Sequence, residues 1–427
     1  MSEDRIAIAE RAAGIVDGLP ADAQARPVAR GAGIGAGVMG GGIAMCFANA
    51  GIPVTLIDIA REGLDRGLAK VRATYAASVQ RGSLAETEME TRLARITGAV
   101  GLEAAKDADV VIEAAFEDMG VKTGIFHALD AVAKPGAVLA TNTSYLDVDA
   151  IAAATTRPGD VLGLHFFSPA NVMRLVEVVR AEKTAPDALL TGVELGRRLG
   201  KLPVVVGVCF GFVANRMLAQ RSLAADRLLL DGATPRQVDD AITGFGFRMG
   251  HFAMLDLAGL EIGYRARKIT GYQAPVADAL AALGRYGQKT GSGFYRYAPG
   301  ARTGEDAPDT QALIAEMARE RGLKPRAFDD DAILARLFYP IVNEGAKILD
   351  EGVAARASDV DLIWINGFGW PKATGGPLAW ADHIGLSRIV AALERDAAAM
   401  DDPSLAPAPL LRRLAASGGA LANWSPA

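Results

Sequence analysis

The sequence has little cysteine, few histidines and no long apolar run. Two of its 427 residues are cysteines and four are histidines. Two thiols cannot make a disulfide scaffold, and so low a count is typical of a reducing compartment. No apolar run approaches the ~20 residues that a helix needs to cross a bilayer, so we expect no membrane span.

Neither end of the sequence resembles a secretory or a peroxisomal targeting signal. Acidic residues stand at positions 3 and 4, where a secretory signal would be basic and then apolar. The last residues, Trp-Ser-Pro-Ala, differ from the Ser-Lys-Leu peroxisomal signal. A cytoplasmic location is therefore expected.

An excess of charge of one sign is also absent. The 45 basic and 50 acidic residues give a net charge of −5, which provides no electrostatic footprint for nucleic acid. Hydrophobic residues make up 50% of the chain and charged residues 22%, a composition with ample material for buried cores. The length predicts more than one domain.

Apolar strand-like runs alternate with longer helical stretches between residues 29 and 208, which predicts a mostly parallel sheet covered on both faces. The runs are 54–58, 110–114, 137–140, 161–164 and 204–207. A charged helical pair at 61–95 interrupts this alternation. We predict an N-terminal helix and linker at 1–28, an α/β domain at 29–208, and helical domains at 209–300 and 301–427, with a linker around 298–309.

The two helical segments share a pattern. The first has the landmarks Asp231-Gly, Val238-Asp, Gly244-Phe-Gly-Phe and Asp256-x-x-Gly259-Leu. The second has Glu351-Gly, Val360-Asp, Gly367-Phe-Gly-Trp and Asp382-x-x-Gly385-Leu. The same landmarks in the same order predict a duplicated all-α domain.

A glycine motif, Gly35-x-Gly37-x-x-Gly40, opens a helix-compatible stretch, and Asp58 ends the next strand. Such glycines allow a tight turn, close approach of backbone to a pyrophosphate, and packing of helix on strand. An acid at that spacing accepts hydrogen bonds from ribose hydroxyls and repels a 2′-phosphate, so we predict NAD as the cofactor. The expected contacts are Gly35, Ala36, Gly37, Val38, Met39, Gly40 and Asp58. The alternative is a glycine-rich turn in an unrelated α/β protein.

The strand before this motif fits less well. Gly31 and Gly33 weaken a central strand, and Arg30 is costly if it is buried. Either the strand is short or local packing compensates. A second frame, in which Gly31 and Gly33 begin the motif, places the acid less well.

Among the histidines, His165 stands apart because it ends an apolar strand, and ligands in open α/β sheets collect at the carboxyl ends of strands. Glu177 lies within the apolar run that follows, and a carboxylate paired with His165 would orient its imidazole. The alternatives are a satisfied core histidine and a surface glutamate on an edge strand. His127 is expected to be a packing or surface residue.

Five segments together resemble the L-3-hydroxyacyl-CoA dehydrogenase family. They are Gly35–Ala44, Val111–Glu117, Thr141–Ser144, His165–Pro169 and Gly211–Arg216, and the later Gly287–Tyr295 agrees. The resemblance covers nearly the whole chain and is nearest to the dehydrogenase part of peroxisomal-type multifunctional β-oxidation enzymes. It implies a Rossmann-type NAD-binding domain followed by the duplicated helical domains, and a stand-alone dehydrogenase without the hydratase domain that precedes this part in those enzymes.

The resemblance also implies roles for particular residues. His165 would exchange a proton with the substrate 3-hydroxyl, Glu177 would stabilise the imidazolium, and Ser144 and Asn215 would hydrogen-bond substrate oxygens. Cofactor contacts are carried over to Glu117, Lys122, Ser168 and Lys289. Outside the resemblance, Ser144 could be a turn residue, Asn215 a helix cap, and the two side chains Glu117 and Lys122 a solvated pair.

The helical pair at 61–95 resembles the family's CoA-contacting tail. Its candidates for CoA phosphates are Lys70, Arg72, Thr74 and Arg81, although a solvated basic face is the alternative for each. One departure is His251, which stands where relatives usually have proline and could change the rigidity of that turn.

We therefore expect reversible NAD-dependent oxidation of (S)-3-hydroxyacyl-CoA to 3-oxoacyl-CoA, without a metal. The alternatives are a dehydrogenase of a related 3-hydroxy acid without CoA and a non-catalytic NAD-binding protein. The duplicated helical domain could occupy the place of a dimer partner, so we also expect a monomer that contains an internal pseudo-dimer.

Overall fold

The computed structural model describes residues 3–16 and 18–425. These residues form two compact units. Residues 3–213 and 352–355 make an α/β unit, and residues 214–351 and 356–427, as far as they are described, make a helical unit.

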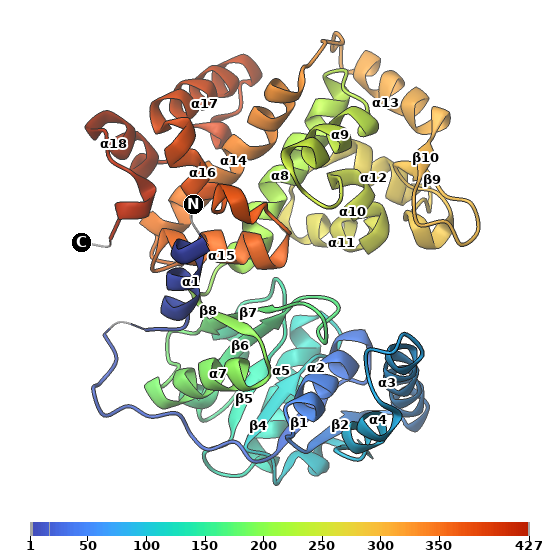
Figure 1. The fold of residues 1–427 in the computed structure, drawn as a ribbon, viewed down its shortest axis with the longest axis vertical. Coiled ribbons are helices and arrows are strands. Elements are labelled where there is room, and N and C mark those ends of the chain that lie inside the picture. Colours follow the sequence, from blue (N-terminus) through green and yellow to red (C-terminus); the bar gives the residue numbers. More distant parts are fainter. Residues whose placement is uncertain (1–2, 17, 426–427) are drawn as a thin grey trace. The chain divides into compact units, whose positions relative to one another are not determined.

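The α/β unit is built on one eight-stranded sheet in the order β3-β2-β1-β4-β5-β6-β7-β8 (Figure 1). Its strands are β1 Gly31–Ile34, β2 Val54–Asp58, β3 Ile96–Val100, β4 Val110–Glu113, β5 Val138–Thr141, β6 Val161–Phe166, β7 Leu175–Arg180 and β8 Leu202–Gly207. Neighbouring strands are parallel except β6 and β7, which are antiparallel. The order from β3 to β6 is that of the Rossmann fold, so the predicted fold class is confirmed.

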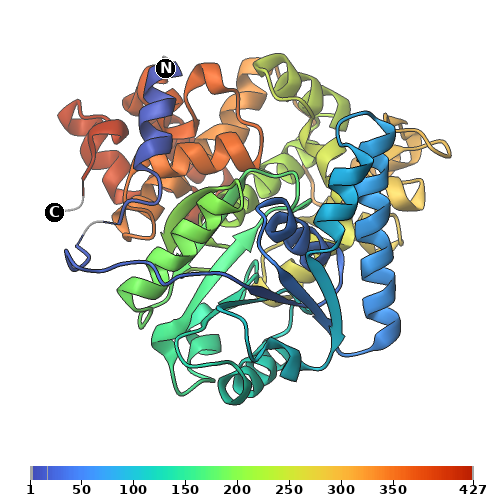
Figure 2. The same cartoon turned by 60° about the horizontal axis from the view of Figure 1, so that its bottom comes forward.

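Helices cover both faces of this sheet (Figure 2). One apolar core joins the strands to α2 (Val38–Asn49), α3 (Arg61–Gln80) and α7 (Pro186–Arg198). A second core, on the other face, joins them to α5 (Met119–Val132) and α6 (Val148–Ala152). The remaining elements of the unit are α1 Glu3–Ala12, α4 Glu86–Leu93, η1 Leu102–Ala105 and η2 Pro158–Asp160.

The structure of β1 accounts for Gly31, although not for Gly33, where a Cβ would make only an ordinary contact with Leu56. The strand is only four residues long, and Arg30 lies outside it and is exposed. A Cβ on Gly31 would stand 2.5 Å from the ring of Phe47, which is fully buried. The aromatic ring from α2 therefore fills the space that a side chain on the strand would otherwise take. Both compensations considered from the sequence are present.

Two connecting segments contain strands that the sequence did not predict. The strand β3 was missed, because Thr97 and Gly98 make it look like a loop after a charged helical pair and only the edge of the sheet is involved. The stretch around 298–309, expected as a linker, contains β10 (Glu305–Asp306), which pairs with β9 (Tyr295–Arg296).

The segment before β1 packs on the sheet unit rather than serving only as a linker. Ala13 is buried, and the carboxylate of Glu10 pairs with Arg174. Further along, Arg26 pairs with Asp187 of α7 at 2.8 Å. In Figure 2 this segment runs past α7 on its way to β1.

The helical unit contains two successive sets of helices. The first comprises α8 Phe212–Leu230, which begins just before the division between the units, with α9 Pro235–Phe245, α10 His251–Ala258, α11 Leu260–Thr270, α12 Pro275–Ala282 and η3 Gln288–Thr290. The second comprises α14 Asp330–Asp350, α15 Ala357–Gly367, η4 Lys372–Thr374, α16 Pro377–Ile384, α17 Leu386–Met400, η5 Pro403–Leu405, α18 Pro409–Ser417 and η6 Leu421–Asn423, after α13 Pro308–Glu320.

The repeated landmarks make the same bonds in both sets. Asp239 accepts hydrogen bonds from the first amides of α10, as Asp361 does from those of α16. Asp256 accepts from the amides of residues 294 and 295, and Asp382 accepts from those of residues 421 and 422. These carboxylates, of which all but Asp382 are buried, satisfy helix and loop amides that would otherwise lack a partner, which explains the repeated order of landmarks in the two halves. The predicted duplication is confirmed.

No helix in the described part of the chain is both long enough and apolar enough to cross a membrane.

Candidate active site

The nucleotide turn lies between β1 and α2. Gly35 has φ = +95°, and a Cβ on Gly40 would stand 1.8 Å from the carbonyl oxygen of Gly35. Only glycine fits at both places. Gly37 caps α2 without a side-chain hydrogen bond, and no acidic residue lies in the first turn of that helix. The helix therefore presents its first amides unscreened, as a phosphate site requires.

Asp58 lies at the carboxyl end of β2, directly beside this turn. Its Oδ2 accepts a hydrogen bond from the amide of Ala36 at 2.9 Å, and its Oδ1 accepts a long one from the amide of Ala60 at 3.3 Å. The carboxylate thus braces the glycine turn and stays half-buried, so part of it faces solvent. This is the place where the sequence predicts contact with ribose hydroxyls.

His165 and Glu177 are directly opposite each other on the antiparallel strands β6 and β7. His165 Nδ1 lies 2.8 Å from Glu177 Oε2, and the exposed fractions of the two side chains are 5% and 0%. The bond to the carboxylate sets the orientation of the ring and leaves Nε2 as the nitrogen that can exchange a proton with a substrate. Glu177 is not a surface residue on an edge strand, because β8 covers β7 on its other side.

The second oxygen of Glu177 is held by a strained turn. The amide of Val213 donates to Glu177 Oε1 at 3.1 Å. The residue before it, Phe212, has φ = +49°, an unusual conformation for a bulky side chain, and is completely buried. Its ring centroid lies 5.7 Å from that of His165. The turn therefore packs an apolar wall against the imidazole and fixes its carboxylate partner.

Ser144 stands in a turn after β5 that one carboxylate organises. Glu117 Oε1 accepts hydrogen bonds from Thr143 Oγ1 at 2.6 Å, from the amide of Ser144 at 2.8 Å and from the amide of Tyr145 at 3.1 Å. The side chain of Glu117 is about one-third exposed at 35%. Glu117 and Ser144, which the sequence predicts to have separate roles, are thus in direct contact.

Lys122 is held in a buried ion pair. Its Nζ donates to both oxygens of Glu113, at 2.7 and 3.0 Å, and lies 3.4 Å from Glu117 Oε2. Lys122 is 1% exposed and Glu113 is fully buried. The alternative of a solvated surface pair is therefore wrong for Lys122. Its contact with a cofactor remains a prediction.

The residues predicted to contact CoA phosphates lie on and just after α3. Thr74 Oγ1 donates to the carbonyl of Lys70 at 2.8 Å, and Arg81 donates to Ser78 at 3.2 Å. Arg72 is paired with Glu90 at 2.8 Å, which leaves its guanidinium less available than those of its neighbours. Ser168, predicted as a cofactor contact, is exposed after the end of β6.

Two predicted residues belong to the helical unit. Asn215 lies in the first turns of α8, and Lys289 in η3 pairs with Glu261. Their predicted contacts with substrate and cofactor stay predictions. His127 is exposed on α5, as expected of a surface residue.

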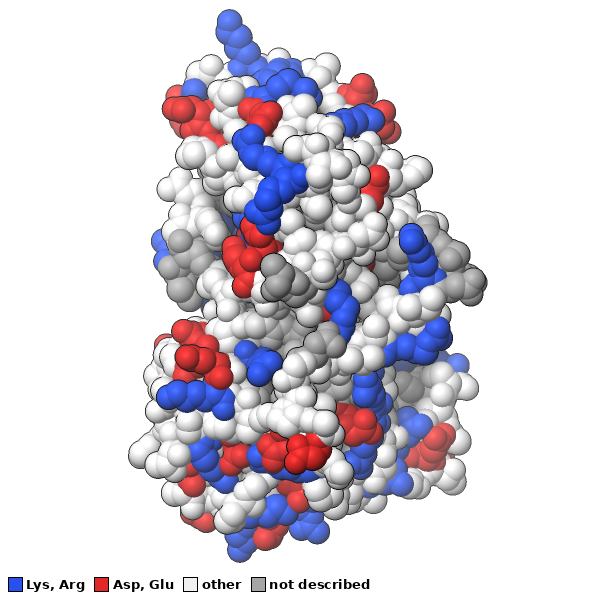
Figure 3. All heavy atoms as spheres, turned by 90° about the vertical axis from the view of Figure 1, so that its left-hand side faces the viewer, with Lys and Arg blue, Asp and Glu red and all other residues white. Residues whose placement is uncertain are grey.

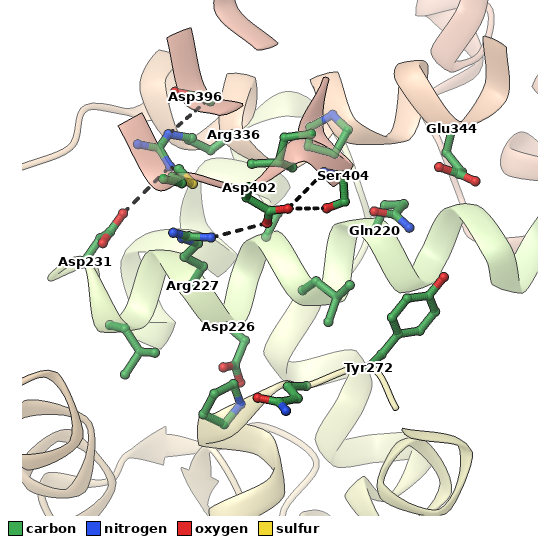
Figure 4. A pocket seen from close by; sticks show the side chains of 18 of the residues that line it. Gln220, Asp226, Arg227, Asp231, Tyr272, Arg336, Glu344, Asp396, Asp402 and Ser404 are labelled. Carbon is green, nitrogen blue, oxygen red and sulfur yellow. Dashed lines mark hydrogen bonds and ion pairs between the residues drawn. The ribbon is translucent and has the colours of Figure 1, made fainter. Parts of the chain in front are cut away.

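A separate cavity of about 680 Å³ lies within the helical unit (Figure 4). Its ionic side chains are matched to one another, for example Arg336 with Asp396 at 3.4 Å and Arg227 with Asp402 at 3.6 Å. Burial raises the pKa of Asp226 in its wall to about 6. None of the predicted site residues is among those that line this cavity, so we do not assign it to the reaction.

Two features of the described residues bear on other kinds of site. Histidine, cysteine, aspartate and glutamate nowhere gather in a group of three or more that could hold a metal ion within that part of the chain. On the face drawn in Figure 3, basic and acidic side chains are intermingled rather than gathered by sign.

Sequence reasoning missed three contributors to the site. They are the carboxylate of Glu113, the hydroxyl of Thr141, which donates to Glu113 Oε2 at 2.7 Å, and the amide of Val213. The only signal for Glu113 was a carboxylate at the end of an otherwise apolar strand, the same signal that drew attention to Glu177.

Family models match most of the chain. Residues 32–209 match the model described as "3-hydroxyacyl-CoA dehydrogenase, NAD binding domain". Residues 211–297 and 333–421 both match the model described as "3-hydroxyacyl-CoA dehydrogenase, C-terminal domain". The double match coincides with the two sets of helices.

Individual proteins agree with these models. The chain is 40% identical over 405 residues to the peroxisomal bifunctional enzyme of Danio rerio, a match that covers 90% of this chain and 56% of that enzyme. The chain thus spans little more than half the length of this relative. The 3-hydroxybutyryl-CoA dehydrogenase of Escherichia coli superimposes with a TM-score of 0.80 at 29% identity, over 92% of this chain and 100% of that one. The dehydrogenase part of multifunctional enzyme 1 from C. elegans gives 0.70 at 30% identity, over 96% and 97%.

Proposed function

Because this chain belongs to the 3-hydroxyacyl-CoA dehydrogenase family, we propose that it oxidises (S)-3-hydroxyacyl-CoA to 3-oxoacyl-CoA, reversibly and with NAD. The observation that carries the proposal is the buried pair of His165 and Glu177 at the carboxyl end of β6. The ends of β1, β2, β4 and β5 meet at the same edge of the sheet, because these strands run parallel to β6. The nucleotide turn and the Ser144 turn therefore lie on the side of the sheet that carries the imidazole.

The residues at the nucleotide turn suit NAD. The Cβ-free space at Gly40, the uncapped amides at the start of α2 and the carboxylate of Asp58 match a pyrophosphate and an unmodified ribose. When bound, NAD supplies the acceptor for the hydride that leaves C3 of the substrate.

The protein's part in the reaction is proton transfer and positioning. Nε2 of His165 takes the proton of the 3-hydroxyl as the C3–H bond breaks, and returns it in the reverse direction. The carboxylate of Glu177 stabilises the imidazolium that this creates, with its second oxygen kept in place by the Val213 amide. Ser144 and Asn215 would hydrogen-bond the substrate oxygen and hold the reacting carbon in place.

We propose that the enzyme recognises its substrate partly through the CoA group. The basic and polar residues of the α3 region, Lys70, Thr74 and Arg81, would meet its phosphates, with Arg72 a weaker candidate because Glu90 already pairs with it. The relatives described above are named for CoA-linked substrates or for bifunctional peroxisomal enzymes. The activity of their remaining length is not part of this proposal.

The test is the loss of NADH absorbance with acetoacetyl-CoA and with a longer 3-oxoacyl-CoA. We expect turnover with both, and a fall of about 100-fold or more in kcat for His165→Ala, since general acid–base catalysis is typically worth that much. His127→Ala is the matched control, because that histidine is exposed on α5 and should leave the rate unchanged.

The other outcomes separate the alternatives. Equal turnover of acetoacetate and acetoacetyl-CoA would favour a dehydrogenase without CoA recognition. Binding of NADH without turnover of any acyl-CoA would favour a non-catalytic role and would contradict the proposal.

We further propose a monomer in which the second helical set takes the place of a partner's, and a cytoplasmic location. Each set has an equivalent capping carboxylate, Asp239 in the first and Asp361 in the second, and the family model of the C-terminal domain matches both sets. This equivalence supports an internal pseudo-dimer. Sedimentation at twice the chain mass would contradict the monomer. Fractionation of the source cells would test the location.

A further inference from the structure

We propose that Glu113 is a positioning residue for the dehydrogenase reaction. It would act through Lys122 and Glu117 on the turn that carries Ser144, and through the 114–115 backbone on the nucleotide turn. This inference rests on the proposed function, since it assigns Glu113 a part in that reaction.

Glu113 is a fully buried carboxylate at this edge of the sheet, as Glu177 is. It ends β4, and its hydrogen-bond partners come from α5, from β5 and from the backbone that follows β4. Its oxygens accept from Lys122 Nζ at 2.7 and 3.0 Å, from Thr141 Oγ1 at 2.7 Å and from the Ala115 amide at 2.6 Å. A buried charge needs this many partners, so the carboxylate and the ammonium hold each other in one place.

The first arm of the network reaches the substrate turn. Lys122 Nζ, fixed by Glu113, lies 3.4 Å from Glu117 Oε2. The other oxygen of Glu117 accepts from Thr143 and from the amides of Ser144 and Tyr145. One oxygen of Glu117 therefore faces the ammonium while the other sets the conformation of the turn. A shift of Lys122 toward Glu117 would pull that carboxylate away from the Ser144 amide.

The second arm reaches the nucleotide turn. The Ala115 amide that donates to Glu113 belongs to the backbone against which Gly35 packs. A Cβ on Gly35 would stand 2.7 Å from the carbonyl oxygen of Ala114 and 3.1 Å from the nitrogen of Ala115. Because the approach is this close, a displacement of the 114–115 backbone toward Gly35 must displace the glycine turn. Glu113 thus connects the nucleotide turn with the turn that carries Ser144, and the reaction requires these two turns to be correctly placed relative to each other.

The test compares Glu113→Gln with wild type in steady-state kinetics and in NADH binding followed by fluorescence. The amide keeps the shape but leaves Lys122 with Glu117 as its remaining carboxylate. We expect kcat with acetoacetyl-CoA to fall about tenfold or more, because small misplacements at a reacting site have effects of that size, and the Kd for NADH to rise.

A change in overall stability has to be separated from positioning. The matched control is Asp361→Asn, which alters a buried carboxylate of the helical unit that accepts from two helix amides at 2.7 and 3.2 Å. It should lower the melting temperature while leaving kcat and the Kd for NADH unchanged. The decisive readout is coupling: in a Glu117→Ala background, Glu113→Gln should have little further effect on kcat, because its path to Ser144 is already broken.

If Glu113→Gln does not fold, Thr141→Val tests the same network. It removes one donor to Glu113 without leaving a buried charge unpaired, and should lower kcat in the same direction, again without a further effect in the Glu117→Ala background. Folded variants of Glu113 or Thr141 with wild-type kcat and NADH affinity would overturn the proposal, as would full additivity with Glu117→Ala. If wild type itself shows no turnover, the proposed function fails, and unchanged NADH affinity in Glu113→Gln would then overturn the second arm separately.

Discussion

Replacing His251 with proline should stabilise the helical unit. His251 is 1% exposed, and neither of its ring nitrogens has a hydrogen-bond partner among the described residues. Burial lowers the pKa of this imidazole well below its usual value, and the nearby Arg221 lowers it further. The corresponding position of the second helical set is Pro377, the first residue of α16.

The backbone at this position already suits proline. His251 is the first residue of α10, where the amide has no helical partner to lose. Gly250 before it has φ = −68° and ψ = 165°, the extended conformation that precedes proline. Asp239 caps the amides of Phe252 and Ala253, neither of which the substitution touches. The same arrangement of Asp361 and Pro377 exists in the second set.

The magnitude follows from three terms. Removing an unsatisfied buried polar group gains about 1–3 kcal/mol, and proline at a compatible site adds about 0.4–1 kcal/mol through the unfolded chain. Against these stands the lost packing of the imidazole, which lies edge-on to Phe252 with centroids 5.3 Å apart; a loss of buried volume of this kind costs roughly 1–2 kcal/mol. The centres of these ranges give a net stabilisation of about 1 kcal/mol, with a rise of a few degrees in Tm.

Tryptophan fluorescence is the natural assay, because all four tryptophans of the sequence lie in the helical unit, at positions 364, 370, 380 and 424. Its pH dependence gives a second check. An imidazole whose pKa is lowered by folding binds its proton more readily in the unfolded chain, so wild type loses stability as the pH falls below about 6.5, by up to about 1.4 kcal/mol per pH unit. The gap between His251→Pro and wild type should therefore widen from pH 7 to pH 5.

The refuting results are specific. A Tm equal to or below that of wild type, or a gap that does not widen with acid, would mean that the imidazole nitrogens are satisfied in the folded protein. His127→Ala, on an exposed histidine of the other unit, controls for the loss of a histidine alone.

Three further predictions concern the active site. Gly40→Ala should destabilise the α/β unit and abolish NADH binding, because its Cβ would stand 1.8 Å from the Gly35 carbonyl oxygen. A Cβ on Gly37 would meet nothing within 4 Å, so Gly37→Ala should leave the melting temperature unchanged and only weaken NADH binding in a titration. Asp58→Asn keeps an acceptor for the Ala36 amide but removes the negative charge, so the ratio of kcat/KM with NADP to that with NAD should rise about tenfold; an unchanged ratio would contradict the role of the charge. Glu177→Gln should lower kcat about 100-fold with little change in the KM for NADH, whereas a fall in kcat together with a large rise in that KM would argue for collapse of the site instead.

Much of the α/β unit could be predicted from local patterns. The glycine motif and Asp58 predicted the nucleotide turn, because the glycine positions have backbone requirements that few other residues meet. The terminal position of His165 on its strand indicated the right edge of the sheet. The missed strand β3 has neither a continuous apolar run nor an alternating one, so it carried no local signal.

Contacts between distant residues were beyond local patterns. That Gly31 is matched to Phe47, and that Glu113 binds Lys122 and Thr141, depends on where helices and strands meet after folding. The pairing of His165 with Glu177 could be considered from the residue types alone, but the register of β6 against β7 that places them opposite each other is a property of the folded sheet.

The sequence by itself therefore determined the fold class, the duplication and the chemistry of the candidate groups, since periodicity, glycine positions and residue types are local properties of the chain. Only the tertiary structure decided which of those groups are buried, paired and directed at one another. The physical reason is that burial makes an unpaired charge costly, so the roles of Glu113, Lys122 and His251 are set by the partners that the fold supplies or withholds.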